Sequence, residues 1–184
     1  MTRIAVLTPS IPERGALLAE AVASVAAQTR RPDVHLIHVD YDRIGGAASL
    51  NRLLVGAVAA SCEWCALLAD DDVLLPRHLQ VLEAATGDAD IVYPWCRVEG
   101  RPGFDPNALF DPERLRHGNY IPGTVLMRTA LASRLGGWRS DALYGFEDWD
   151  MWKRALAAGA RFVCVPEVTW VYRFHGTNDS WRAA

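Results

Sequence analysis

The stretch at residues 64–76, W-C-A-L-L-A-D-D-D-V-L-L-P, constrains the fold of this chain more than any other. Its apolar residues lead directly into three adjacent acids, Asp70, Asp71 and Asp72, and a second apolar run follows them. A short apolar run with such boundaries is typical of a buried strand. The acids therefore lie at the carboxyl end of a strand, where open α/β sheets bind their ligands.

Three adjacent carboxylates repel one another and raise one another's pKa values, and a bound cation removes this cost. No Cys or His stands directly beside the three acids, and oxygen ligands alone favour Mg²⁺ or Mn²⁺. The alternative is an acidic turn covered by solvent, which the apolar residues on both sides disfavour. The sequence thus predicts a divalent-cation site at this strand end.

The first 93 residues alternate short apolar runs with stretches whose apolar residues recur at helical spacing. Besides the strand that ends in acids, this pattern predicts strands at 3–8, 34–39 and 90–93 and helices at 16–28, 47–60 and 76–85. Such alternation favours an α/β fold with a parallel, doubly wound sheet and right-handed crossovers. The sheet would bring to one edge the polar residues that follow its strands: Thr8, Ser10, Asp40, Asp42 and the three acids.

The second half of the chain has a less regular pattern. Residues 98–112 are rich in Gly and Pro and are expected to be irregular. The elements predicted after them are a strand at 121–128, a helix at 129–135, a helix that Glu147 opens and Gly159 stops, and strands at 161–165 and 169–174. No repeat or linker interrupts the 184 residues, so the sequence predicts a single domain, 1–184.

The composition argues against several classes of protein. A net charge of −3 disfavours a nucleic-acid or anionic-membrane partner. The longest apolar stretch, 53–60, is too short to span a bilayer, and Pro9 ends an N-terminal run that resembles a strand rather than a signal peptide. The C-x-x-C of Cys62 and Cys65 precedes a strand, whereas a thioredoxin-type motif follows one. Buried thiols in a reducing, cytoplasmic compartment are therefore expected.

A second group of acids, E-D-W-D at residues 147–150, opens a predicted helix. Acids in a first helical turn commonly cap the helix or balance its dipole, and that role is the alternative here. The neighbouring aromatic residues favour a different role, because aromatic surface beside carboxylates is the usual make-up of a sugar-binding pocket: Tyr144, Phe146, Trp149 and Trp152. For the two tryptophans alone, an aromatic stripe of the core is the alternative. A carboxylate at a helix N-terminus is held ionised, which suits a catalytic base.

His175 follows the last predicted strand in Y-R-F-H-G-T-N-D-S. A structural role is one interpretation of this histidine. The other is a nitrogen ligand to the same cation, which suits Mn²⁺ more than Mg²⁺. In that case the polar tail at 176–180 would act as a flap over the bound molecule.

Four of these motifs, in this order and spacing, resemble those of the large, inverting family 2 of GT-A glycosyltransferases. T-P-S-I-P-E-R resembles the nucleotide-binding opening of that family, and A-D-D-D-V-L-L-P resembles its metal (DXD) motif. G-F-E-D-W-D-M-W-K-R resembles the catalytic-base motif, and P-E-V-T-W-V-Y-R-F-H the closing strands. The resemblance covers residues 4–180 and implies the GT-A fold, a Rossmann-like three-layer sandwich with a mostly parallel central sheet.

The resemblance also implies a donor site and a metal site. Asp71 would ligate the cation, with Asp70 or Asp72 beside it and His175 as a further ligand. The family usually shows Asp-Asp-Gly-Ser after its second strand, where this chain has D-Y-D-R at 40–43. The residues implied in donor binding are Thr8, Pro9, Ser10, Arg14, Asp40, Asp42, Asn51 and Asp70.

The base and the acceptor contacts are implied in the same way. Asp148 would be the catalytic base, and Glu147 would contact the acceptor or position the base. Trp149 and Phe146 would bind the acceptor. Few residues remain between Tyr93 and Tyr120 to build a lid over the acceptor. The alternatives are a small acceptor, or an acceptor site that a homodimer partner or a membrane surface completes.

The implied activity is metal-dependent, inverting transfer of a sugar from a nucleotide-diphosphate sugar to an acceptor hydroxyl. UDP is the expected nucleotide on family frequency, with Mn²⁺ or Mg²⁺ as cofactor. Residues 1–93 would bind the nucleotide sugar and residues 94–184 the acceptor. The alternatives are a sugar-1-phosphate nucleotidyltransferase, which would normally carry a Gly-rich loop after its first strand, and a non-catalytic nucleotide- or sugar-binding module.

Overall fold

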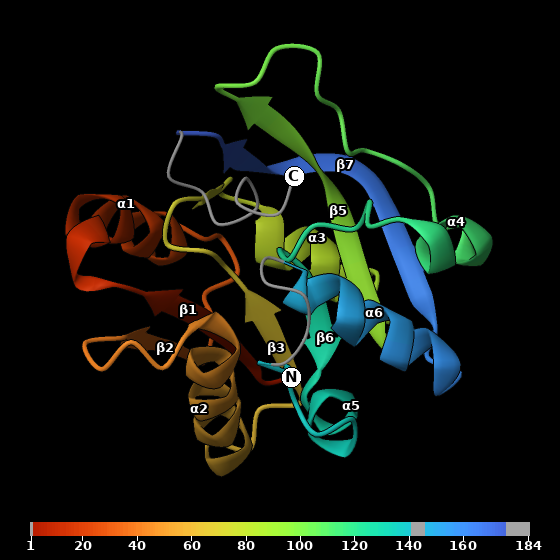
Figure 1. Cartoon of the computed structure of the whole chain (residues 1–184), viewed down its shortest axis with the longest axis horizontal. Helices are drawn as coiled ribbons and strands as arrows, with labels where there is room; N and C mark the ends of the chain where they lie inside the picture. Colours follow the sequence, from red (N-terminus) through yellow and green to blue (C-terminus); the bar gives the residue numbers. More distant parts are fainter. Residues whose placement is uncertain (1, 141–145, 176–184) are drawn as a thin grey trace.

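The core of the protein is one sheet of seven strands in the order β2-β1-β3-β6-β5-β7-β4 (Figure 1). The computed structural model describes residues 2–140 and 146–175. The strands are β1 (Ile4–Ser10), β2 (Val34–Val39), β3 (Trp64–Leu67), β4 (Val73–Leu74), β5 (Ile91–Glu99), β6 (Leu126–Arg128) and β7 (Phe162–Arg173). β1 pairs in parallel with β2 and β3, and β5 with β7. Because β6 is antiparallel to both β3 and β5, and β4 is antiparallel to β7, five of the seven strands share one direction. The mostly parallel sheet is confirmed.

Helices cover both faces of this sheet. After a 3-10 turn, η1 (Pro12–Arg14), they are α1 (Gly15–Ala26), α2 (Gly46–Ala59), α3 (His78–Ala84), α4 (Pro112–His117), α5 (Thr129–Arg134) and α6 (Glu147–Ala157). Side chains alternate along β1, so Ala5 and Leu7 pack with α2, α5 and α6, while Ile4 and Val6 pack with α1 and α3. The three predicted layers are therefore present. None of these helices, within the part of the chain that is described, is long and apolar enough to cross a bilayer.

The last strand differs from the prediction. The strands predicted separately at 161–165 and 169–174 form one strand, β7, which pairs with β5 along its length. The register with β5 skips Pro166 and Glu167 and then Thr169, so β7 bulges around Pro166. A bulge accommodates a proline because its missing N–H would otherwise break the ladder of hydrogen bonds.

The middle of the chain also differs from the prediction. β5 continues to Glu99, so the irregular stretch is shorter than expected. Of the residues predicted as a strand at 121–128, only those of β6 form one. A helix that periodicity did not reveal, α4, begins at the end of the irregular stretch and is only six residues long. Its N-cap, Asp111, accepts the N–H groups of Glu113 and Arg114 at 2.8 and 3.1 Å.

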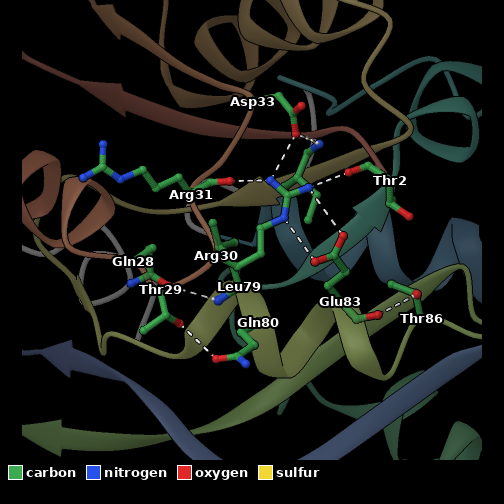
Figure 2. A network of polar contacts seen from close by, with 11 residues as sticks. Thr2, Gln28, Thr29, Arg30, Arg31, Asp33, Leu79, Gln80, Glu83 and Thr86 are labelled. Atoms are coloured by element: carbon green, nitrogen blue, oxygen red, sulfur yellow. Dashed lines mark hydrogen bonds and ion pairs between the residues drawn. The ribbon is translucent and has the colours of Figure 1, made fainter.

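Polar contacts hold the connection between α1 and β2 against α3 (Figure 2). Arg30 donates from Nε to Glu83 at 3.1 Å and from Nη1 to Asp33 at 3.1 Å. Its Nη2 also donates to the carbonyl of Thr2. One guanidinium group thus ties the connection to the N-terminal segment and to α3.

The amide of Gln28 is the buried member of this group of contacts. Gln28 is 3% exposed, and its Nε2 donates to the carbonyl of Leu75 at 2.8 Å, while its Oε1 accepts the N–H of Leu79 at 3.0 Å. These two backbone groups belong to the segment that directly follows the three acids. Gln28 therefore fixes the end of the acidic turn against α1.

Replacing Gln28 by Ala should lower the free energy of unfolding by about 1–3 kcal/mol, because a buried N–H and a buried carbonyl lose their partner. Urea unfolding followed by circular dichroism measures this. The control is Gln80→Ala, because Gln80 is exposed and its Oε1 accepts from the exposed Oγ1 of Thr29. This variant should change the free energy of unfolding by less than about 0.5 kcal/mol. Equal stability of Gln28→Ala and wild type would show that the amide does not hold this segment.

Candidate active site

A cavity of about 440 Å³ opens at the carboxyl ends of β1 and β3. Both halves of the chain line it, including Pro9, Arg14 and Asp71 from the first half and Asn119 and Asp148 from the second. The acidic strand end and the acidic helix start, which are far apart in the sequence, therefore face the same cavity. Such a position is where parallel sheets bind ligands.

The three acids at the end of β3 are buried, and the end of β1 and η1 provide partners for two of them. Asp70 accepts from Oγ of Ser10 at 2.7 Å and from Nη1 of Arg14 at 3.0 Å. The same Arg14 nitrogen lies 3.3 Å from Oδ2 of Asp71. Burial raises the pKa of Asp70, although the contacts with Ser10 and Arg14 act in the opposite direction. Arg14 thus supplies positive charge to two of the three carboxylates.

The end of β7 meets the other side of the same acids. Nε2 of His175 lies 3.0 Å from Oδ2 of Asp71, and the backbone N–H of Arg173 donates to Oδ1 of Asp72 at 3.0 Å. Burial and then the charge of Asp71 raise the pKa of Asp72 well above its ordinary value. The predicted metal ligands Asp71, Asp72 and His175 are therefore close together.

These side chains fit a cation held partly by the protein. Oδ2 of Asp71 and Nε2 of His175 are an oxygen and a nitrogen donor beside each other. Within residues 2–140 and 146–175, no group of three or more His, Cys, Asp or Glu side chains is arranged to hold a metal ion by itself. Mg²⁺ commonly binds through one or two carboxylates and completes its shell with water and substrate phosphates. The donor set suits that kind of site.

Asp148 lies in the first turn of α6 and faces the cavity. Nδ2 of Asn119 donates to both of its carboxylate oxygens at 3.1 Å, and the N–H of Trp149 donates to Oδ1 at 2.6 Å. Burial raises the pKa of Asp148 to about 6, the hydrogen bonds lower it, and the charge of Glu147 raises it. Such a carboxylate is mostly ionised at neutral pH and is more basic than an ordinary aspartate, as a general base requires.

Solved structures of a glycosyltransferase share this architecture. Residues 1–349 of S. aureus TarS, a GT-A-type glycosyltransferase, with UDP-GlcNAc bound match at a TM-score of 0.77 and 14% identity, over 100% of this chain and 62% of that one. The same protein with UDP bound matches at a TM-score of 0.71 and 14% identity, over 94% and 61%. The chain has the GT-A fold.

The similarity to TarS lies in the fold rather than in the sequence. No family model matches the chain, and no curated protein matches it in sequence. The chain spans about three fifths of the length of the TarS structures. Within this GT-A fold, the roles of individual side chains rest on the geometry of this chain.

The donor residues predicted from the sequence fall into two groups in this GT-A fold. Pro9 and Arg14 line the cavity, and Ser10 and Asp70 bind each other beside it. The remaining four are not among the described residues that line the cavity: Thr8, Asp40, Asp42 and Asn51.

Three of those four have other partners, and the fourth is on the surface. Oγ1 of Thr8 lies 3.0 Å from Nε2 of His35 on β2. The carboxylate of Asp40 accepts the N–H groups of Ile44 and Gly45 at 3.0 and 2.8 Å, which shapes the turn before α2. Asp42 is exposed.

Asn51 does not face the cavity but binds the backbone of Trp138, which does. Its Nδ2 donates to the carbonyl of Trp138 at 2.8 Å, and its Oδ1 accepts the N–H of Trp138 at 2.8 Å. Gly137 has a φ of +74°, and a Cβ atom there would lie 2.1 Å from Oδ1 of Asn51. Asn51 therefore holds the backbone that carries Trp138, which lines the cavity.

The aromatic residues near Asp148 have different surroundings. Phe146 lines the cavity, whereas the indole of Trp149 donates to the carbonyl of Leu115 at 2.7 Å and packs edge-on against Phe146. Tyr144 lies outside the described residues, as does the tail at 176–180. Asp150 accepts from Nε of Arg154 at 2.7 Å and is not among the described lining residues. Of the acids in this turn, Glu147 and Asp148 line the cavity.

Sequence reasoning missed one wall of the cavity. Phe104, Tyr172 and Phe174 contact one another through their rings, and the guanidinium of Arg101 lies over the rings of Phe104 and Phe174 at 4.7 and 5.2 Å. The alternating aromatic residues of the last strand were the available signal for Tyr172 and Phe174. Arg101 and Phe104 belong to an irregular stretch with no comparable pattern.

Replacing Asp148 by Asn should raise the free energy of unfolding at pH 7. The folded-state pKa of about 6 lies above the ordinary value of 3.8, so the native carboxyl holds its proton more tightly than the unfolded one. The stability that this proton contributes is fully present below pH 3.8 and is lost as the pH rises through 6. A difference of about 2 pKa units sets the upper limit of the gain at about 3 kcal/mol.

Urea unfolding at pH 4 and pH 7 measures this gain, which should be much smaller at pH 4. A helix-capping role for Asp148 predicts the opposite sign, a loss of about 1 kcal/mol at pH 7. Asp150→Asn breaks the contact with Arg154 and serves as the control, and it should gain no stability at either pH.

Proposed function

We propose that this chain is a glycosyltransferase that moves a sugar from a UDP-sugar to an acceptor hydroxyl, with inversion and with help from a divalent cation. The observation that carries the proposal is the meeting of two acid groups in one cavity. One group, at the end of β3, pairs with Arg14 and His175, and the other provides Asp148, whose pKa of about 6 suits a base. The GT-A fold, shared with a protein that binds UDP-GlcNAc, supports the choice of donor.

The donor half of the reaction is assigned to the end of β3. Arg14 lines the cavity and supplies positive charge where an anionic diphosphate would bind. Asp71 and His175 would hold Mn²⁺ or Mg²⁺, with Asp70 or Asp72 as the adjoining acid. When bound, the cation would supply positive charge that stabilises the departing nucleotide diphosphate.

The acceptor half is assigned to the start of α6. Asp148 takes the proton from the acceptor hydroxyl, whose oxygen then attacks the anomeric carbon. Because the base and the departing nucleotide lie on opposite faces of the sugar in such a displacement, the configuration at that carbon is inverted. Glu147 and Phe146, which line the same part of the cavity, contact the acceptor.

The thiols support a cytoplasmic location. Cys62, Cys65, Cys96 and Cys164 are all free, and burial raises the pKa of each. Free, buried thiols are the usual state of cysteines in a reducing compartment.

Binding of UDP should depend on Mn²⁺ and on the acids that end β3. Calorimetry in Mn²⁺ and in EDTA measures this dependence. The double variant Asp71→Asn, Asp72→Asn should lose Mn²⁺-dependent binding, and His175→Ala should weaken it. Asp88→Asn, which alters an exposed ion pair with Arg161, is the control. Equal UDP affinity of the wild type in EDTA and in Mn²⁺ would contradict the metal assignment.

Asp148→Asn should bind UDP and Mn²⁺ nearly as the wild type does, because the amide has the shape of the carboxylate. Transfer should fall by at least about a hundredfold, since a positioned base contributes about a hundred- to ten-thousand-fold. Asp150→Asn should have a mild effect by comparison. Donor affinity by calorimetry and turnover of a UDP-sugar by UDP release test this pair. Near-native turnover of Asp148→Asn would show that Asp148 is not the base. Absence of turnover in the wild type and in every variant would indicate a non-catalytic binding module.

A further inference from the structure

The rings of Phe104, Tyr172 and Phe174 form one wall of the cavity, here named the aromatic wall. All three residues are partly exposed. The ring of Phe174 lies 5.4 Å from that of Phe104, edge-on, and 4.6 Å from that of Tyr172. In the described part of the chain, neither Phe104 nor Phe174 belongs to an apolar core cluster. Core packing therefore leaves these two rings unexplained.

The last strand carries two of the rings into the cavity. Alternate residues of an extended chain point to the same side, so Trp170, Tyr172 and Phe174 lie on one side of β7 and the residue that follows it. Trp170 is 1% exposed and belongs to the core, whereas Tyr172 and Phe174 are partly exposed. This row of aromatic residues thus begins in the core and ends in the cavity.

A tight turn after β5 brings the third ring to the aromatic wall. The N–H of Phe104 donates to the carbonyl of Arg101 at 3.3 Å, across Pro102 and Gly103. Gly103 has a φ of +80°, and a proline followed by such a glycine is the make-up of a type II turn. The sequence R-P-G-F therefore fixes where Phe104 lies.

The end of β7 holds this turn in place. The N–H of Phe174 donates to the carbonyl of Glu99 at 2.9 Å. Gly100 has a φ of +82°, and a Cβ atom there would lie 2.1 Å from the backbone oxygen of Phe174. A glycine is needed for so close an approach of the two backbones. The aromatic wall is thus positioned by backbone contacts, as a preorganised binding site requires.

Arg101 adds hydrogen-bond donors to the aromatic wall. Its guanidinium carbon lies 4.7 Å from the ring centre of Phe104 and 5.2 Å from that of Phe174, and the residue lines the cavity. A guanidinium group carries several N–H donors and no acceptor. The wall therefore combines apolar ring surface with groups that bind oxygen atoms.

A sugar ring matches this combination. The C–H bonds of a pyranose ring with equatorial hydroxyls lie on its faces, and its hydroxyl groups lie around its edge. The faces of aromatic rings carry negative charge, which attracts the weakly positive C–H hydrogens. The hydroxyl oxygens at the edge can accept from a guanidinium group. A purely apolar ligand would make no use of Arg101.

The position of the aromatic wall in the sheet favours the acceptor over the donor. Nucleotides bind where the strand order of a parallel sheet reverses, which is between β1 and β3 in this protein. The wall lies instead at the ends of β5 and β7, and β6 separates β5 from β3. Asp148, the proposed base, lines the same cavity as the wall.

We propose that the aromatic wall binds a pyranose ring of the acceptor and that Arg101 donates to the hydroxyl groups of this ring. The inference rests on the proposed function and deepens it. The acceptor is then a sugar or a glycan, rather than a lipid alcohol or an open-chain polyol. The bound ring holds the acceptor in the cavity while Asp148 takes the proton of the reacting hydroxyl.

Saturation-transfer NMR tests this binding with two probes, methyl β-D-glucopyranoside and methyl β-D-galactopyranoside. UDP and the diamagnetic Mg²⁺ fill the donor site. Saturation should pass from the protein to the ring C–H hydrogens of at least one glycoside, and more strongly to one face of the ring than to the other. Sorbitol, which has hydroxyl groups but no ring, should receive much less. Absence of transfer to both glycosides, or equal transfer to sorbitol, would overturn the proposal.

Two variants connect the binding to the aromatic wall. Phe104→Leu keeps an apolar side chain and removes the ring, so the dissociation constant of the glycoside should rise about twofold to tenfold. Arg101→Met keeps the stem and removes the donors, and it should weaken binding as well. Phe104→Trp retains an aromatic face and should retain binding. An unchanged dissociation constant in either Phe104→Leu or Arg101→Met would overturn the proposal.

A matched control separates these effects from a loss of structure. The ring of Phe110 stacks on that of Phe162 at 4.8 Å, and Phe110 is not among the described residues that line the cavity. Phe110→Leu should lower the free energy of unfolding and leave glycoside binding unchanged. Weaker glycoside binding in this control, equal to that in Phe104→Leu, would count against a specific role of the aromatic wall.

A competition experiment distinguishes the acceptor from the sugar of the donor. It uses Asp148→Asn, which lacks the proposed base and so does not consume UDP-GlcNAc. The glycoside should bind equally well in the presence of UDP and of UDP-GlcNAc. Displacement of the glycoside by UDP-GlcNAc but not by UDP would show that the wall holds the sugar of the donor, and the proposal would be rejected.

The outcomes also separate this inference from the function on which it rests. A protein that binds UDP-sugars but neither glycoside would overturn the role of the aromatic wall and leave the glycosyltransferase assignment intact. A wild-type protein that binds neither UDP nor UDP-sugars would count against the proposed function, and the inference would be rejected with it.

Discussion

The burial of three adjacent carboxylates at the end of β3 is the constraint on which the rest of the structure depends. Each of the three is at most 6% exposed. Charged groups remain inside a protein only when other groups of opposite charge or hydrogen-bond donors reach them. Ser10 supplies such a group from the end of β1 and Arg14 supplies one from η1, and the backbone of Arg173 supplies another from β7. The ends of these three strands therefore have to meet, and the cavity forms where they do.

The start of α6 shows a second constraint, because the carboxylate enclosed there lowers the stability of the folded protein. A carboxylate enclosed by protein gives up hydration, and two donor groups restore only part of it, so the pKa of Asp148 remains near 6. The surrounding contacts keep this costly arrangement in place. The indoles of Trp149 and Trp152 donate to backbone carbonyls of the segment that carries Asn119, so the site cannot relax without breaking them. Local destabilisation of this kind is common where a protein performs chemistry.

The parts of the fold with strong local signals could be predicted from the sequence. β2 was predicted at 34–39 and is found there, because turn residues bound its apolar run on both sides. The bulge in β7 could not be predicted, since Pro166 has the same local appearance at a bulge as at the end of a strand. In the site, the acids at the end of β3 carried their own signal. Asn119 carried no such signal, because its hydrogen bond to Asp148 of α6 joins residues that are 29 positions apart in the sequence.

The long strand β7 has a consequence for how this protein tolerates change. One end of β7 packs beside β5 in the core, the bulge at Pro166 lies in its middle, and His175 follows its far end. Removing one bulge residue would move every later side chain to the other face of the sheet and turn His175 away from Asp71. Substitutions in this strand are therefore easier to accommodate than deletions. Over evolution, selection would preserve the number of residues between Phe162 and His175 more strictly than most of their identities.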